Sequence, residues 1–432
     1  MRTPIGAVFI VSIMVFLDFY VFSALKSVSQ GASEKTRVFI YVAYWIVAIA
    51  ALAGILLFVY TDRNFMSKKI RTYFFATVLA FVFAQLIAGV FFLIDDVRRL
   101  IQWAAGKVFF RNTEISTMSS DKINRSVFLS WLGLAAGTTL FGSLMYGFTN
   151  KYKYKVKRIK LSFDNLPEGF NGMKIVHFSD VHSGSFMDKK AVMHGVEKII
   201  AENGDLVIFS GDLVNDRATE MKEYMDVFDK VKAPMGVYST FGNHDYGEYA
   251  RWPYEGVTKE QNLKDLAKVH EQLGWRLMMD EHVELEKNGD KIALIGIQNW
   301  SAKARFPKYG NMKKAYAGAE KYPFKILISH DPSHWDAEVR PEYPEVDLML
   351  SGHTHGMQFG VDIPGFKWSP VQYIYKEWDG LYEEGKQKLY VNPGFGFIGY
   401  PGRVGILAEI TVIELESSKT TIDDSSEYFL NS

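Results

Sequence analysis

The 432-residue sequence contains no cysteine. Disulfide bonds, thiolate metal sites, haem attachment through cysteine and cysteine nucleophiles are therefore all excluded. The formal net charge is zero, because 49 basic residues balance 49 acidic ones. The two parts of the chain differ, however: residues 1–157 hold 18 Lys/Arg against 7 Asp/Glu, a net charge of +11, and residues 158–432 hold 31 against 42, a net charge of −11. The acidic part makes nucleic acid an improbable partner, because binding its phosphates requires clustered Lys/Arg.

Charged residues are almost absent from four apolar stretches in the first third of the chain. Each stretch has about 20 residues, the length that a helix needs to cross the hydrocarbon core of a bilayer. They predict an integral, multi-pass membrane protein of the cell membrane, with a membrane domain over residues 1–157. The four transmembrane helices are expected at about residues 5–25, 38–60, 72–94 and 126–148.

Asp18 is the only Asp, Glu, Lys, Arg or His within these stretches. It is either a functional intramembrane group or a residue near a helix end or facing the bundle, and we favour the second interpretation. Residues 97–110 are either an amphipathic interfacial helix or a continuation of the third stretch. The distribution of Lys/Arg, with the basic run at 151–160, favours a cytoplasmic C-terminal part.

Short β-rich runs alternate with polar, helical stretches after residue 160. One helix is expected at 189–203, where apolar residues recur with helical spacing. This pattern predicts an α/β or α+β domain over residues 158–416, with helices covering sheets, followed by a polar tail at 417–432. The expected strands are 174–179, 206–210, 237–241, 291–297, 325–329, 347–350, 388–391 and 405–415.

Histidine and acidic residues gather directly after these strands, where an α/β sheet normally places its functional site. Imidazole and carboxylate groups together suit Mn, Fe, Co and Zn. In D-x-H and H-x-H on an extended segment, both side chains point to the same side and can grip one ion or two adjacent ions. Glycines at 211, 242 and 352 allow sharp turns and keep the pocket open. The clusters are SDVH (179–182), GD (211–212), GNHD (242–245), SHD (329–331) and SGHTH (351–355).

The order D-x-H, G-D, G-N-H-D, H and G-H-x-H, over about residues 170–415, resembles the calcineurin-like dimetal metallophosphoesterases, in their membrane-anchored bacterial type. The resemblance implies a four-layer αββα sandwich around two divalent metal ions, with Mn, Fe or Zn expected. It also implies that Asp212 bridges both ions, that His244 acts on the substrate and that Asp245 orients this histidine. The implied ligands of the first ion are Asp180, His182 and His355, and those of the second ion are Asn243, His330 and His353.

Substrate contacts are less sharply indicated. Arg217 and Arg403 are candidates for binding a phosphate, although Arg217 could equally be a surface residue. The basic and aromatic stretch at 299–325 is either a loop that receives an anionic head group or a basic helix surface. The aromatic stretch at 359–382 either docks against the bilayer or lines an acyl-chain groove, or else packs in the core, which we favour.

The implied reaction is hydrolysis of a phosphoester or pyrophosphate bond by a hydroxide that two metal ions activate. His244 would protonate the leaving oxygen or stabilise the charged oxygens. We expect a lipid-linked or interfacial phosphorylated substrate. One alternative is a phosphodiesterase or phosphatase for soluble substrates, with the helices only as an anchor. Another is a non-catalytic, metal-bound sensor or scaffold, but a histidine that is not a ligand has no use there. The sequence gives no indication of the oligomeric state.

Overall fold

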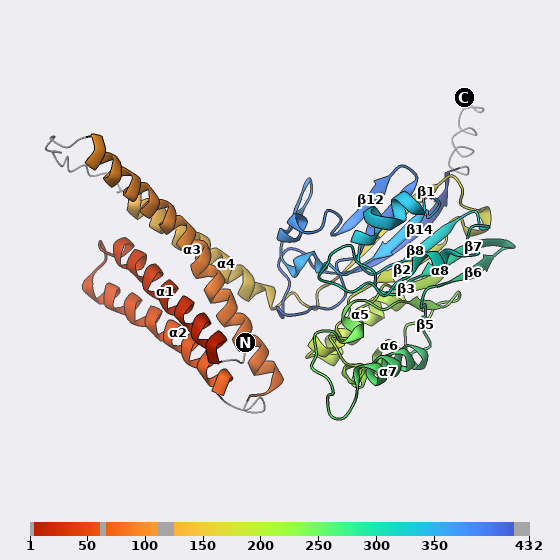
Figure 1. Ribbon diagram of the computed structural model, residues 1–432, viewed down its shortest axis with the longest axis horizontal. Coiled ribbons are helices and arrows are strands. Elements are labelled where there is room, and N and C mark those ends of the chain that lie inside the picture. Colours follow the sequence, from red (N-terminus) through yellow and green to blue (C-terminus); the bar gives the residue numbers. More distant parts are fainter. Residues whose placement is uncertain (1–3, 61–65, 110–124, 419–432) are drawn as a thin grey trace. The chain divides into compact units, whose positions relative to one another are not determined.

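The computed structural model describes residues 4–60, 66–109 and 125–418 (Figure 1), and the chain divides into two compact units at 146/147. The described part of the N-terminal unit consists of helices, four of which are long and apolar enough to cross a membrane. The predicted set of four transmembrane helices is therefore confirmed. These helices are α1 (Pro4–Val28), α2 (Glu34–Tyr60), α3 (Lys68–Phe109) and α4 (Arg125–Gly147).

Helix α3 is longer than the predicted third span. It continues without a break for 42 residues, so residues 97–109 extend this helix. Local side-chain pairs support the extension: Arg98 forms an ion pair with Asp95 at 2.7 Å, and the ammonium group of Lys107 lies over the ring of Trp103. Such pairs, three or four residues apart, stabilise a helix. In the structure, this segment is therefore a continuation of the third transmembrane helix, which was one of its two predicted alternatives.

Asp18 faces the interior of the helix bundle, where its side chain is 1% exposed. The amide nitrogen of Gln85, on α3, donates to Asp18 Oδ1 at 2.6 Å and lies 3.0 Å from the hydroxyl of Tyr44. The Tyr44 hydroxyl, on α2, donates to the backbone carbonyl of Asp18 at 2.9 Å. Asp18 therefore faces the bundle, as the favoured interpretation expects, and this polar cluster joins three helices where lipid offers no hydrogen bonds.

The C-terminal unit contains two six-stranded sheets and a small two-stranded ribbon. The first sheet has the order β1 (Tyr154–Phe163), β14 (Ala408–Ser417), β2 (Lys174–Phe178), β3 (Leu206–Phe209), β4 (Val237–Ser239) and β5 (Arg276–Leu277). The second has the order β12 (Gly380–Glu384), β13 (Gln387–Val391), β9 (Leu348–Ser351), β8 (Lys325–Ile328), β7 (Asp290–Gly296) and β6 (Glu281–Lys287). The ribbon pairs β10 (Val361–Ile363) with β11 (Phe366–Trp368).

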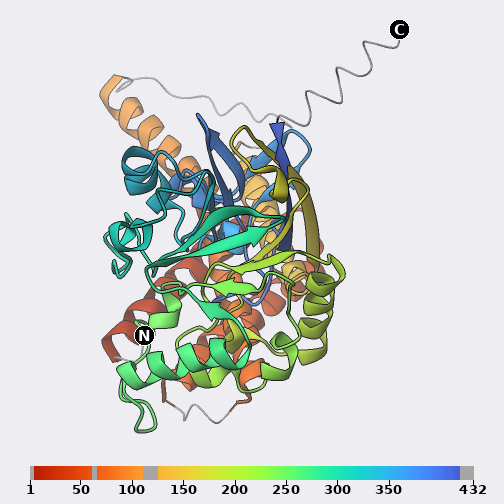
Figure 2. The ribbon, with the colours of Figure 1, turned by 90° about the vertical axis from the view of Figure 1, so that its right-hand side faces the viewer.

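The two large sheets pack face to face, with helices on their outer faces. Strand β3 illustrates the layering, because its successive side chains point in opposite directions. Leu206 and Ile208 join the core between the sheets, and Val207 and Phe209 join the core under the helices. Figure 2 shows helical segments on both sides of the strands. The predicted αββα sandwich is confirmed. The covering helices are α5 (Lys189–Ala201), α6 (Met225–Phe228) and α7 (Lys259–Gln272) on the first sheet, and α8 (Met312–Tyr316) and α9 (Arg340–Glu342) with the turn at Trp335–Val339 on the second.

Strand β1 was not among the predicted strands, because residues 151–160 were interpreted as a basic segment after the last span. The run alternates Lys with Tyr, Val and Ile, a period of two that is typical of a strand. Strand β1 pairs in parallel with β14, from Tyr154 opposite Ala408 to Phe163 opposite Ser417. The predicted boundary at 157/158 consequently falls inside β1. The proposed tail at 417–432 lies outside the described residues, except for Ser417 and Ser418.

Candidate metal centre

All seven predicted metal ligands lie in loops that follow strands of the two sheets. Two groups have ligand atoms within 4.8 Å of one another, as a metal site requires: the first is Asp180, His182 and His355, and the second is Asp212, His330 and His353. These two groups contain six of the seven predicted ligands, and the seventh, Asn243, has its Oδ1 2.7 Å from Nδ1 of His353. Asp180 and His182 follow β2, Asp212 follows β3, Asn243 and His244 follow β4, His330 follows β8, and His353 and His355 follow β9.

Five of these ligands have a left-handed backbone conformation, which is uncommon for residues other than glycine. Each turns the chain sharply at or near the end of a strand. Backbone strain of this kind persists where the surrounding structure enforces it, and it concentrates at functional sites. The φ angles are 54° for Asp180, 47° for His182, 62° for Asp212, 75° for His353 and 53° for His355.

The first group is almost completely buried. Nε2 of His355 lies 3.2 Å from Asp180 Oδ1 and 3.0 Å from Nε2 of His182. Nε2 of His182 is also 3.5 Å from Asp212 Oδ2, so this carboxylate reaches the first group as well. Burial lowers the pKa of His182 well below its ordinary value. Its imidazole is therefore neutral and can bind a metal ion.

Asp212 also approaches the second group. Its Oδ2 lies 3.2 Å from Nε2 of His330, whose Nδ1 is held 2.8 Å from the carbonyl of Ser210. Burial, the largest single effect, lowers the pKa of His330, but the charge and hydrogen bond of Asp212, the charge of Asp180 and the hydrogen bond to Ser210 together outweigh it and raise this pKa to about 10. The position beside Asp212 therefore favours positive charge, which either a proton or a metal ion can supply.

His353 provides the clearest indication of a cation. Its Nε2 lies 2.8 Å from the hydroxyl of Tyr375, which itself donates to Asp331 at 3.2 Å, and this arrangement favours the tautomer with the histidine proton on Nε2. Nδ1 then presents a lone pair to Oδ1 of Asn243 at 2.7 Å. The amide nitrogen of Asn243 is directed elsewhere, to the hydroxyl of Tyr249. Two acceptors at this distance, with no hydrogen between them, fit a metal ion that binds both.

His244 lies beside both groups and belongs to neither. Its backbone N–H donates to Asp212 Oδ1 at 2.8 Å, which fixes the Asp212 carboxylate. Its Nδ1 lies 2.8 Å from the carbonyl of Asn215. The ring packs edge-on against the ring of His182, with 4.9 Å between centroids. Since Nδ1 is engaged by a backbone carbonyl, Nε2 is the nitrogen that a substrate can use.

Asp245 does not have the role that the resemblance implied. Its carboxylate accepts backbone N–H groups from Asp212, Leu213, Val214 and Gly242, at 2.8–3.2 Å. Asn215, not Asp245, provides the described contact to the His244 imidazole. Residues that follow one another in a turn point in different directions, so Asp245 fastens the two ligand loops together.

The two candidate phosphate-binding arginines lie away from the cavity at the metal centre. The Arg217 guanidinium lies 3.7 Å from the ring centroid of Tyr254 and lines a separate cavity of about 470 Å³. Arg403 is fully buried and donates to the carbonyls of Gly394 and Gly396, with Nη2 3.5 Å from Nδ1 of His355. Arg403 therefore supports the loop beside His355, and neither arginine is among the residues that line the cavity at the metal centre.

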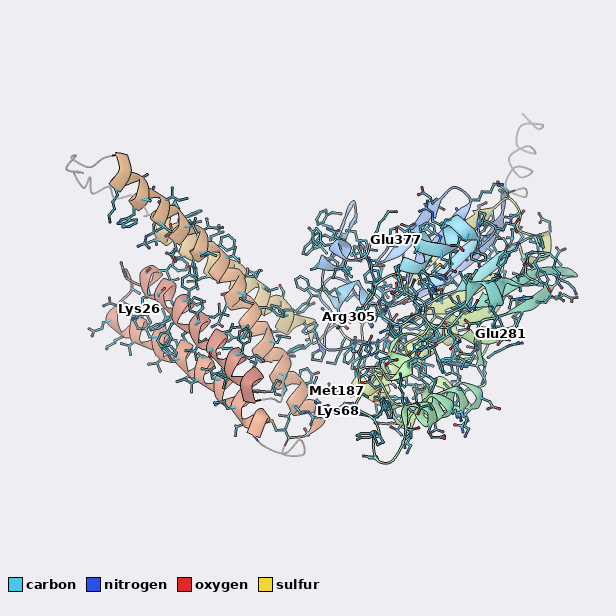
Figure 3. The ribbon with its side chains drawn as sticks, viewed as in Figure 1. Lys26, Lys68, Met187, Glu281, Arg305 and Glu377 are labelled. Atoms are coloured by element: carbon cyan, nitrogen blue, oxygen red, sulfur yellow. The ribbon has the colours of Figure 1, made fainter. Side chains whose placement is uncertain are left out.

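A cavity of about 240 Å³ opens at the metal centre. Arg305, labelled in Figure 3, and Phe306 extend into its lining from the loop between β7 and α8. The sequence indicated this loop only as one of two alternatives for residues 299–325. No sequence signal pointed to Tyr249 or Ile398, because neither belongs to a motif. The lining residues are His182, Asp212, Asn243, His244, Tyr249, Arg305, Phe306, His353, His355 and Ile398.

Comparison with known proteins agrees with this geometry. Residues 173–357 match the family model of the calcineurin-like phosphoesterases, and residues 1–151 match that of a probable calcineurin-like phosphoesterase transmembrane domain. A transmembrane protein with metallophosphoesterase domain from Danio rerio is 28% identical over 63% of this chain, and the match spans 60% of that protein's length. One of the same name from Bos taurus is 23% identical over 95% of this chain and 89% of its own length. The metallophosphoesterase YkuE of Bacillus subtilis is 28% identical over 69% of this chain and 99% of its own length.

Proposed function

The chain belongs to the calcineurin-like phosphoesterases, and we propose that it hydrolyses a phosphoester or pyrophosphate bond in a lipid-linked or interfacial substrate, using two divalent metal ions. The observation that carries the metal dependence is the contact between His353 Nδ1 and Asn243 Oδ1, two acceptors that face each other at 2.7 Å. With the histidine proton on Nε2 both atoms are acceptors, and a shared cation then accounts for their close approach.

In this proposal Asp180, His182 and His355 hold one ion, and Asn243, His330 and His353 hold the other. Asp212 serves both, since its Oδ2 lies within 3.5 Å of a histidine nitrogen in each group. Nitrogen and oxygen donors without sulfur suit Mn, Fe or Zn. When bound, such a pair of ions polarises a phosphoryl group and lowers the pKa of water.

The chain's own residues complete the site. His244 Nε2 would donate a proton to the leaving oxygen, because Nδ1 is occupied by the Asn215 carbonyl. The Arg305 guanidinium, on the cavity wall, would bind an outer phosphate oxygen with a charge-assisted hydrogen bond. Phe306 packs edge-on against His353 and limits the access of water to that side.

Two features support a substrate at the membrane. Helix α4 ends at Gly147 and β1 begins at Tyr154, so the catalytic unit follows the last span closely. Such a tether raises the effective concentration of the enzyme at a bilayer substrate. The cavity, at about 240 Å³, is also smaller than the pockets of roughly 300–1,000 Å³ that enclose whole ligands. It suits a phosphoryl group whose remaining substrate lies outside.

The test uses full-length protein purified in detergent. Hydrolysis of bis-p-nitrophenyl phosphate and p-nitrophenyl phosphate is measured with Mn²⁺ and with chelator, followed by phospholipid phosphates in mixed micelles. Asp212→Ala should abolish metal-dependent turnover, and His244→Ala should lower it by about 10²–10⁴-fold, the usual contribution of a general acid. His194→Ala, at an exposed histidine on α5, should retain full activity.

Three outcomes would contradict parts of the proposal. Saturation at fewer than two ions per chain would overturn the two-metal assignment. Full activity in Asp212→Ala would overturn the site. Turnover of soluble esters without any turnover of micellar lipid phosphates would overturn the lipid substrate and favour the helices as an anchor alone.

A further inference from the structure

Exposed apolar side chains of the C-terminal unit gather in one segment. Ten large hydrophobic side chains are exposed in the described part of this unit, and seven of them lie in residues 357–381. Soluble proteins rarely gather apolar side chains in this way, unless a partner or a membrane covers them. The seven are Met357, Val361, Ile363, Phe366, Tyr373, Ile374 and Leu381.

The centre of this segment is the hairpin formed by β10 and β11. It forms a separate two-stranded sheet, with Ile363 opposite Phe366 across the Pro364-Gly365 turn. All six residues from 361 to 366 are exposed. A two-stranded ribbon has little stability by itself, so its base must hold it in place. Ser369 donates to the carbonyl of Gly356 at 2.8 Å. The base also packs on the buried cluster of Val371, Tyr375, Trp378 and Ile406.

The charged residues of the hairpin are neutralised within the same unit. Asp362 forms an ion pair with Lys155 at 3.3 Å, and Lys367 forms one with Asp379 at 2.8 Å. No other charged residue occurs between 361 and 368. The tip therefore presents apolar side chains without an unpaired charge that would oppose their transfer from water.

The hairpin is tied to the point where the chain leaves the membrane. Gly147 is the last residue of α4, and its carbonyl accepts the backbone N–H of Arg403 at 3.0 Å. The next residue, Val404, exchanges backbone hydrogen bonds with Gln358 and Gly360 at 2.8 Å, directly before β10. Since the end of a transmembrane helix lies at the surface of the bilayer, the base of the hairpin is linked to that surface through a few backbone hydrogen bonds.

We propose that the β10–β11 hairpin docks into the lipid bilayer, with Ile363 and Phe366 in the interfacial region and Tyr373 at the level of the head groups. Aromatic residues favour this level because the ring is apolar and the hydroxyl remains hydrated. Docking does not depend on the reaction proposed above. It would hold the metal centre at the membrane, because the hairpin directly follows the segment of His353 and His355, and Tyr375 at its base contacts His353.

The absence of cysteine allows a direct test in the full chain. Ile363→Cys and Phe366→Cys are each labelled with an environment-sensitive fluorophore, and the protein is reconstituted into phosphatidylcholine vesicles with or without nitroxide-labelled lipid. Ile46→Cys, exposed on the transmembrane helix α2, provides the lipid reference, and Glu286→Cys, exposed on β6, provides the water reference.

We expect nitroxide lipid to quench the labels at 363 and 366 to an extent similar to that at 46, and to leave the label at 286 unquenched. Because the hairpin charges are paired, quenching should not change between about 0.1 M and about 1 M salt, where exposed charges are strongly screened. Adding Ile363→Asp to the Phe366→Cys variant should reduce quenching at 366.

Three results would contradict the proposed docking into lipid. Quenching of both hairpin labels by aqueous iodide, without quenching by nitroxide lipid, would place the hairpin in water. Protection from both quenchers would show that protein covers it, either the transmembrane helices or a second copy of the chain. Loss of lipid quenching at high salt would contradict an apolar insertion. None of these quenching measurements requires catalytic activity, so their outcome is independent of the test of the proposed reaction.

Discussion

The hydroxyl of Tyr375 lies 2.8 Å from Nε2 of His353 and thereby turns Nδ1 of that imidazole toward Asn243. Partners of this kind orient a ligand, and their loss commonly lowers metal affinity about 10–100-fold. We expect Tyr375→Phe to lower the affinity for one of the two ions by this factor and to leave the affinity for the other ion unchanged. Metal content at graded free Mn²⁺ measures it, with Tyr373→Phe, at an exposed tyrosine, as the control. Equal affinity in both variants would show that Tyr375 has no part in orienting His353.

Gly352 has no room for a side chain. A Cβ at this position would overlap Ser179 Oγ and Asp180 Oδ2. Gly352→Ala should therefore displace Asp180 and lower the affinity for the ion that Asp180, His182 and His355 bind. Gly142→Ala in α4 is the control, because open space surrounds that position. Metal titration followed by mass spectrometry distinguishes the two, and normal binding of two ions in Gly352→Ala would contradict the expected displacement.

Arg305 is expected to act on substrate binding. A hydrogen bond to a charged group contributes about 1.5–3 kcal/mol, so Arg305→Ala should raise KM at least about tenfold. The value of kcat should change little, and Arg305→Lys should recover part of the loss because it keeps the charge. Lys313→Ala, at an exposed lysine of α8, provides the control. A fall in kcat at unchanged KM would refute this role and would indicate a contribution to the chemical step.

His270 should make the folded state sensitive to acid. Burial lowers its pKa to about 3, whereas the pKa of a histidine in the unfolded chain is about 6.5. Between these values the unfolded state binds the additional proton. The stability from neutral His270 is therefore fully present above about pH 6.5 and is lost as the pH falls toward 3, by up to about 1.4 kcal/mol per pH unit.

His270→Gln removes this titration and can still form a hydrogen bond with Ser239, whose hydroxyl lies 2.8 Å from Nδ1 of the imidazole. The free energy of unfolding, measured in detergent by tryptophan fluorescence, should fall less steeply between about pH 7 and about pH 5 than in the parent protein. His194→Gln, at an exposed histidine, should leave the slope unchanged. The same slope in His270→Gln as in the parent would contradict a neutral, buried His270.

The loops that hold the seven candidate metal ligands could be predicted because each ligand follows a buried strand within a few residues, while the division of the ligands between two ions came from the resemblance of their order to the family motifs. A strand end is a local feature, and a domain of packed sheets brings several such ends together. The directions of adjacent side chains could not be predicted in the same way. Asp245 follows His244 directly, but its carboxylate binds the backbone of two loops. Arg403 likewise fills the interior because distant carbonyls surround it.

Composition also concealed one element. The Lys-rich run after the last span was interpreted by its charge, although its alternation with Tyr, Val and Ile has the period of a strand. Its partner, β14, lies more than 240 residues further along the chain. The alternation was a local signal for a strand, but a pairing over that distance leaves no signal within a local window, so the partner of β1 became evident only in the fold.

Because β1 pairs with β14, the first sheet can be completed only late in the synthesis of this protein. Strand β1 emerges from the ribosome soon after the last transmembrane helix, and β14 is the final strand to emerge. Strand β1 lies at the edge of its sheet, beside β14, so the nascent chain must wait for its last strand before the membrane anchor is joined to the first sheet. Long-range pairings of this kind form slowly and leave strands open to wrong partners. A chain that ends before Ala408 would therefore be inserted in the membrane with β1 unpaired, and quality-control proteases would be expected to recognise it.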